Sequence, residues 1–229
     1  DGVRSAFTEV WQSSDFSNKK GLTVTEIMDA VHDGDIRSLY VLGENPAMSD
    51  PDVEHARAAL AKLDHLVVQD IFLTETANFA DVILPASAFA EKSGTVTNTN
   101  RQVQMGRPAV PPPGDAKEDW WIEVELAKRL GLGWTYTDPS EVFAEMKLNM
   151  SSLNNITWDR LESEGAVTYP STSPTDPGQA IVFADGFPRQ DGRARFTPAS
   201  IIAPDDAPDD DYPMILTTGR QLEHWHTGS

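Results

Sequence analysis

Apolar positions in the first part of the chain alternate between helical spacing and short continuous runs. Residues 21–33 carry apolar side chains at helical spacing and lead into a turn centred on Gly34, which predicts a helix. Residues 38–42 form a short apolar run that stops at Gly43, as a buried strand does. The same patterns predict a helix from Pro51 to Leu63, a strand over 65–69, a short helical piece over 75–80 and a strand over 82–84.

Strands that alternate with helices predict an α/β fold with a doubly wound, mostly parallel sheet. Ligands of such sheets lie beyond the carboxyl ends of the strands. We therefore expect three polar segments, residues 43–46, 70–76 and 91–98, to converge on one face.

The second half of the chain has more interrupted patterns. Residues 91–104 are typical of a loop and hairpin, and residues 119–130 of an amphipathic helix. Shorter helices are predicted over 140–146 and 158–164, a hairpin over 180–196, and a new strand from Met214 to Thr218. We expect a central α/β domain with a helical and hairpin extension over 1–203, an acidic linker over 204–211 and the start of another domain over 212–229.

Composition and charge exclude several classes of function. The chain has no Cys, which excludes a disulfide, a thiolate zinc site, an iron–sulfur cluster and a cysteine nucleophile within this stretch. The net charge of -18 argues against a nucleic-acid surface; it is typical of a solvated surface, with an acidic docking face as the alternative.

No run of about 18 apolar residues and no export signal is present, so we expect a cytoplasmic location and no membrane contact, with a periplasmic location left open. The chain begins at Asp1 and ends just after a dense polar motif. We therefore expect it to be an internal piece of a longer protein.

Three segments that follow predicted strands carry residues suited to binding a ligand. Gly43 permits close backbone approach to a ligand, and Asn45 offers a donor and an acceptor, although an ordinary turn uses the same residues. Asp70 is suited to accept the paired N–H donors of a guanine edge, or to cap the loop that follows. Residues 91–101 concentrate hydroxyl, amide and guanidinium groups beside Gly94, which suits a pyrophosphate or a pterin.

Near the end of the chain, one histidine lies on each side of Trp225. His224 and His226 lack a third ligand at a suitable spacing, so a metal site is disfavoured. Imidazole groups that hydrogen-bond a ligand are the better interpretation.

Three strings occur in order at long intervals: VLGENPAMSDPD at 41–52, VVQDIFLTETANFADVILPASAFAEKSGTVTNTNRQVQ at 67–104 and LTTGRQLEHWHTG at 216–228. Together they resemble the catalytic subunits of the dimethyl-sulfoxide-reductase superfamily of molybdopterin oxidoreductases. Within this superfamily, the quoted sequence strings are most similar to those of formate dehydrogenase alpha subunits, and the resemblance extends over residues 21–229. The resemblance implies that the start of a C-terminal, pterin-binding β-barrel domain lies at residues 212–229.

The resemblance also implies two molybdopterin guanine dinucleotides with molybdenum or tungsten, and an iron–sulfur cluster outside this stretch. It implies no catalytic residue and no metal ligand here, because the metal's cysteine or selenocysteine would lie upstream of Asp1. This stretch alone is therefore expected to be inactive. The implied cofactor-binding positions are Gly43, Glu44, Asn45, Gln69, Asp70, Thr74, Thr76, Glu91, Gly94, Thr95, Asn98, Arg101, Gln104, Gly219, Arg220, His224, His226 and Thr227.

The activity implied by the resemblance is the oxidation of formate, or a similar small anion, to carbon dioxide. Electrons would leave through iron–sulfur clusters to electron-transfer subunits that carry iron–sulfur or flavin and NAD. One alternative is a nitrate reductase catalytic subunit, which shares the HWHTG region; GENPAMSDPD and QDIFLTETA favour formate dehydrogenase. The other is a non-catalytic electron-transfer scaffold related to the large iron–sulfur subunit of complex I. The density of polar cofactor positions argues against the scaffold.

Overall fold

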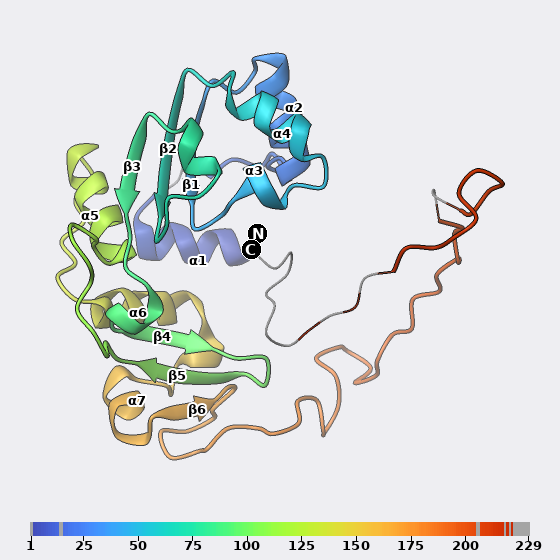
Figure 1. Ribbon diagram of the computed structural model, residues 1–229. Coiled ribbons are helices and arrows are strands. Elements are labelled where there is room, and N and C mark those ends of the chain that lie inside the picture. The colour runs from blue at the N-terminus through green and yellow to red at the C-terminus, as the bar shows by residue number, and fades with distance from the viewer. Residues whose placement is uncertain (1, 14–15, 205–206, 218, 220, 222–229) are drawn as a thin grey trace. The chain divides into compact units, whose positions relative to one another are not determined.

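The computed structural model describes the chain except residues 1, 14–15, 205–206, 218, 220 and 222–229 (Figure 1). The chain forms two compact units, Asp1–Ala180 and Ile181–Ser229. All helices and strands of the described residues belong to the first unit. None of those helices is both long and apolar enough to cross a lipid bilayer.

The first three strands form a parallel sheet. They are β1 (Ser38–Leu42), β2 (His65–Asp70) and β3 (Val82–Pro85), in the spatial order β1-β2-β3. The predicted strands and their parallel pairing are confirmed. The order does not reverse among these strands, however, so the doubly wound arrangement is absent from the described part of the sheet. After Pro85 the chain enters a second, antiparallel sheet, and no strand of the described residues pairs with the free side of β1.

Helices α2 (Val24–Asp33), α3 (Pro46–Ser49) and α4 (Val53–Leu60) lie together beside the parallel sheet (Figure 1). Helix α2 begins where it does because Thr23 caps it: the Glu26 N–H donates to Thr23 Oγ1 at 3.4 Å, and Glu26 accepts from the Thr23 N–H. It ends at Gly34, whose φ of 85° favours glycine. These helices, β2 and the one-turn helix η1 (Thr76–Phe79) bury one apolar core.

The second sheet is antiparallel and holds a separate core. Its strands are β4 (Gly94–Thr97), β5 (Gln102–Gly106) and β6 (Ala166–Thr168), in the order β4-β5-β6. Its helices are α6 (Pro139–Asn149), η3 (Ser151–Leu153) and α7 (Trp158–Glu164). The core residues come from β5, β6, these helices and the connection between η3 and α7: Val103, Phe143, Leu153, Ile156, Leu161 and Val167. The predicted hairpin over 91–104 and the predicted helices are confirmed. The strand β6 was not predicted, because three residues are too few to show the alternation of apolar and polar positions that marks a strand.

Three further helices complete the first unit. They are α1 (Gly2–Trp11), η2 (Phe89–Glu91) and α5 (Asp119–Arg129). The sequence did not predict α1, which has no buried residue. Helix α5 was predicted and buries Ile122, Val124 and Ala127.

The second unit contains turns but, in its described residues, no strand. The predicted hairpin over 180–196 is therefore wrong. Its turn does form, since the Phe187 N–H donates to the Gly192 carbonyl at 3.0 Å, but side chains such as Phe196 remain exposed. A two-stranded hairpin is marginal without a surface that covers its apolar face. Residues 212–217 form no strand either, so the β-barrel start stays a prediction, as does the linker over 204–211.

Candidate cofactor-binding site

The carboxyl ends of the three parallel strands meet at one edge of the sheet. The Gly43 N–H donates to the Gln69 carbonyl at 2.9 Å, directly after β1. The Ala86 N–H donates to the Asp70 carbonyl at 3.0 Å, directly after β3. The loops that follow β1 and β2 therefore start side by side, which is the arrangement that parallel strands predict.

Asn45 joins these two loops through its side-chain amide. Its Oδ1 accepts from the Thr76 N–H at 3.1 Å and from Thr76 Oγ1 at 2.8 Å. Its Nδ2 donates to Glu75 Oε2 at 2.7 Å, and this bond lowers the pKa of the Glu75 carboxyl. Thr76 is fully buried, and its Oγ1 also accepts from the Ala47 N–H at 3.1 Å. The polar side-chain atoms of Asn45 and Thr76 thus form hydrogen bonds within the protein that hold the two loops together.

Gly43, Glu44 and Asp70 face outward at the same edge. Gly43 has a φ of 63°, and a Cβ atom added there would meet no atom within 4 Å. Glu44 is exposed. Asp70 Oδ1 accepts from the N–H of the next residue, Ile71, at 2.7 Å, and no described residue donates to its Oδ2. Thr74 Oγ1, two residues before η1, accepts from the Ala77 N–H at 3.3 Å.

Gln69, like Thr76, is a buried member of the predicted set. Its side chain is 1% exposed, accepts from the Tyr40 hydroxyl through Oε1 and donates to Asp119 Oδ1 at 2.8 Å through Nε2. The Asp119 carboxylate also pairs with Lys92. The sequence patterns did not single out Tyr40, Lys92 or Asp119, since each stands alone in an ordinary strand, loop or helix start.

Residues 91–104 form the β4–β5 hairpin and the turn before it. Glu91 accepts from the Ala88 N–H at 2.8 Å, and Asn98 accepts from the Gln102 N–H at 3.0 Å, so both stabilise local turns. Arg101 has a φ of 66°, and its guanidinium donates to backbone carbonyls. Those carbonyls belong to Tyr169, Gln179 and Ala180.

The remaining predicted residues divide between this hairpin and the end of the chain. Thr95 pairs with Met105 on β5, and Gln104 lies between Val96 and Ala166. A Cβ atom added at Gly94 would meet no atom within 4 Å. Gly219 has no regular structure, and Arg220, His224, His226 and Thr227 lie outside the described residues.

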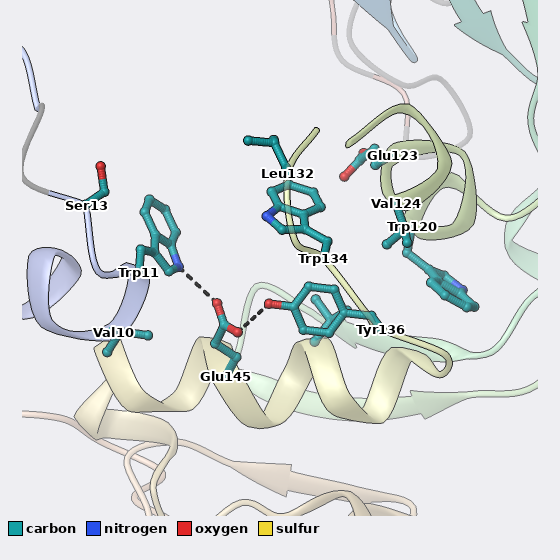
Figure 2. A pocket seen from close by; sticks show the side chains of 11 residues that line it. Val10, Trp11, Ser13, Trp120, Glu123, Val124, Leu132, Trp134, Tyr136 and Glu145 are labelled. Carbon is teal, nitrogen blue, oxygen red and sulfur yellow. Dashed lines mark hydrogen bonds between the residues drawn. The ribbon is translucent and has the colours of Figure 1, made fainter. Parts of the chain in front are cut away.

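A cavity of about 560 Å³ lies between α1, α5 and α6 (Figure 2). Glu145 is at its floor and accepts from Trp11 Nε1 at 3.0 Å and from the Tyr136 hydroxyl. The hydrogen bond from the Tyr136 hydroxyl to Glu145 raises the pKa of Tyr136 to about 12. The lining has two carboxylates and no Lys or Arg, so it does not suit a polyanionic cofactor.

A family model for molybdopterin oxidoreductases matches residues 6–129, more than half of the chain. The chain belongs to the molybdopterin oxidoreductase family. Membership implies a molybdopterin cofactor that carries molybdenum or tungsten. The matched residues include the parallel sheet, both loops joined by Asn45, the hairpin and α5.

Relatives in this molybdopterin oxidoreductase family are similar over nearly the whole chain. The alpha subunit of an F420-dependent formate dehydrogenase of Methanocaldococcus jannaschii is 45% identical over 100% of this chain and 34% of its own length. The corresponding subunit of formate dehydrogenase 2 of Methanococcus maripaludis is 40% identical over 96% of this chain and 32% of its own length. The assimilatory nitrate reductase catalytic subunit of Bacillus subtilis is 36% identical over 98% of this chain and 33% of its own length. The chain thus spans about a third of the length of these relatives.

A solved structure has a similar fold. Acetylene hydratase from Pelobacter acetylenicus superposes with a TM-score of 0.55 at 22% identity. The match covers 73% of this chain and 24% of that enzyme. The match supports an α/β architecture for this chain.

Proposed function

We propose that this chain holds part of the molybdopterin guanine dinucleotide cofactor in the catalytic subunit of a formate dehydrogenase. The observation that carries the proposal is its 45% identity, over the whole chain, to a formate dehydrogenase alpha subunit. When bound, the metal and its two pterins supply the redox chemistry that converts formate to carbon dioxide, a proton and two electrons. The residues of this chain bind and orient the cofactor.

The edge beyond β1 and β2 suits a nucleotide cofactor in its free carboxylate oxygen and its open space. Gly43 at this edge, and Gly94 at the start of β4, leave room for close backbone approach, because a Cβ atom added at either would point into open space. Asp70 offers a carboxylate oxygen that no described residue uses. In the proposed complex Asp70 accepts from the guanine edge, while Asn45 and Thr76 hold the two loops in place. The further proposed contacts are Glu91, Gly94, Thr95, Asn98, Arg101 and Gln104, and also Gly219, Arg220, His224, His226 and Thr227.

Electrons must leave the catalytic subunit, because formate oxidation releases two of them. We propose that they pass through an iron–sulfur cluster outside this stretch to an electron-transfer subunit with iron–sulfur or flavin and NAD. The site of action would be the cytoplasm. The nitrate reductase relative, at 36% identity over nearly the whole chain, makes nitrate reduction the second candidate.

Asp70→Ala tests the proposed guanine contact in the complete polypeptide. Loss of a charge-assisted pair should cost about 1.5–3 kcal/mol, or roughly a tenfold to hundredfold loss in affinity. The variant should therefore fold normally and copurify with less guanine dinucleotide, measured as nucleotide released per folded protein. Asp35→Ala, at an exposed carboxylate before β1 that is not among the proposed contacts, is the matched control and should keep its cofactor.

The bond from the Ile71 N–H to Asp70 provides the competing outcome. If Asp70 only caps this loop, Asp70→Ala should lower stability by about 0.5–2 kcal/mol and leave cofactor content unchanged. Full occupancy together with a lowered melting temperature would remove Asp70 from the proposed contacts.

A further inference from the structure

The Asp119 carboxylate connects two segments that the proposed function assigns to the cofactor. It belongs to the first residue of α5, and its Oδ1 accepts from Gln69 Nε2 at 2.8 Å. Its Oδ2 pairs with Lys92 Nζ. The side chains of Asp119 and Lys92 are 30% and 31% exposed, so the ion pair is largely shielded from water. Gln69 precedes Asp70 in the chain, and Lys92 follows Glu91.

The orientation of the Gln69 amide depends on this carboxylate. Gln69 is buried, with its Oε1 toward the Tyr40 hydroxyl and its Nε2 toward Asp119. A flipped amide would direct its carbonyl oxygen at the carboxylate, which is repulsive. Burial and the nearby Glu123 and Asp119 carboxylates raise the pKa of Tyr40, which keeps its hydroxyl a donor. Only one amide orientation therefore satisfies both partners.

Backbone pairing fixes Asp119 relative to the sheet. Ala86, directly after β3, forms an isolated parallel bridge with Lys117. The Lys117 N–H donates to the Pro85 carbonyl at 3.1 Å, and the Ser87 N–H donates to the Lys117 carbonyl at 2.8 Å. Because Asp119 is two residues beyond this bridge, its carboxylate has a defined place at the carboxyl edge of the sheet.

We infer that Asp119 is a positioning residue for the cofactor site. It acts through Gln69 on the end of β2, which carries Asp70, and through Lys92 on the segment that leads from Glu91 to Gly94. The inference rests on the proposed function, because these two segments are the proposed cofactor contacts. Gln69 accordingly serves as a buried link and not as a ligand contact, although its residue type alone favours either role.

The test compares variants of Asp119 in the complete polypeptide with cofactor bound. Asp119→Ala removes both bonds, and we expect the guanine dinucleotide to dissociate about tenfold faster than from the wild type. Asp119→Asn keeps an acceptor for Gln69 but loses the charge that pairs with Lys92. The guanine dinucleotide should therefore dissociate from Asp119→Asn faster than from the wild type and more slowly than from Asp119→Ala. The readouts are nucleotide release over time and the melting temperature.

Ile122→Ala is the matched control, because Ile122 is buried on the same helix and has no part in the polar network. It should lower the melting temperature at least as much as Asp119→Ala and leave the dissociation rate unchanged. If cofactor release instead follows the melting temperature across all three variants, Asp119 is only structural and the inference is overturned. A wild-type protein without guanine dinucleotide would overturn the proposed function itself, and the inference with it.

Discussion

Asn45→Ala should lower the free energy of unfolding by about 2–4 kcal/mol, because it leaves two donors of the buried Thr76 without a partner. The Thr76 N–H and Oγ1 both donate to Asn45 Oδ1, at 3.1 Å and 2.8 Å. Thr76 is 0% exposed in the wild type, so these two donors have no solvent partner there. Denaturant unfolding of the complete polypeptide, followed by far-UV circular dichroism, measures this loss.

Two further variants separate the buried bonds from the exposed one. Asn45→Asp keeps an acceptor for Thr76 but places a carboxylate against Glu75, so its loss of stability should be smaller than that of Asn45→Ala. Glu44→Ala, next to it in the loop and exposed, should change stability by less than about 0.5 kcal/mol. Equal stability of Asn45→Ala and Glu44→Ala would show that the two loops hold together without this amide.

Arg160→Ala should destabilise the second core of the first unit by about 3–5 kcal/mol, because a buried guanidinium there serves several acceptors. Arg160 is 8% exposed and donates to the carbonyl oxygens of Asn155 at 3.0 Å and Asp176 at 2.6 Å. It also donates to Ser171 Oγ at 3.0 Å and to Glu164 Oε1 at 2.8 Å. Thermal unfolding of the variant, compared with the wild type, measures the loss.

Arg160→Lys and Arg107→Ala are the controls for this prediction. A lysine keeps the charge but lacks the planar fork that reaches several acceptors, so its effect should be intermediate. Arg107 pairs with Glu162 at the surface, where the side chains are 53% and 45% exposed. Arg107→Ala should therefore cost less than about 1 kcal/mol. An Arg160→Ala variant as stable as Arg107→Ala would contradict the assigned role.

The parallel sheet and its converging loops follow from local patterns in the sequence. The apolar run at 38–42 ends at Gly43, and a glycine there agrees with a backbone φ of 63°. Thr23 and Gly34 bound α2 because a capping side chain and a left-handed residue satisfy its free backbone groups. Parallel pairing then brings the ends of β1 and β2 to one edge without further information.

The direction in which each polar side chain points does not follow from those patterns. Gln69 and Asp70 are adjacent and both polar. Gln69 is nevertheless buried against Tyr40 and Asp119, whereas Asp70 stays at the edge. The partners are 29 and 50 residues away, so no local spacing reveals them. Arg101 likewise reaches carbonyls 68 to 79 residues further along the chain.

The predicted hairpin over 180–196 failed for a related reason. The turn at Gly192 is local and does form, whereas strands need a neighbouring surface that covers their apolar side chains. The sequence signal for a hairpin reports the turn and the alternation, and neither identifies that surface. The three-residue strand β6 shows the converse case: β5 pairs with it although it has no recognisable pattern.

Formate-dependent dye reduction by the complete polypeptide, purified without oxygen, tests the central claim most directly. The same preparation is analysed for metal and for released guanine nucleotide, and nitrate with a reduced dye is the matched assay. We expect molybdenum or tungsten with two guanine nucleotides per metal atom, and electron transfer from formate that exceeds electron transfer to nitrate. A metal-loaded protein that reduces nitrate and does not oxidise formate would contradict the proposed activity, and a protein without pterin nucleotide would contradict the proposed cofactor site.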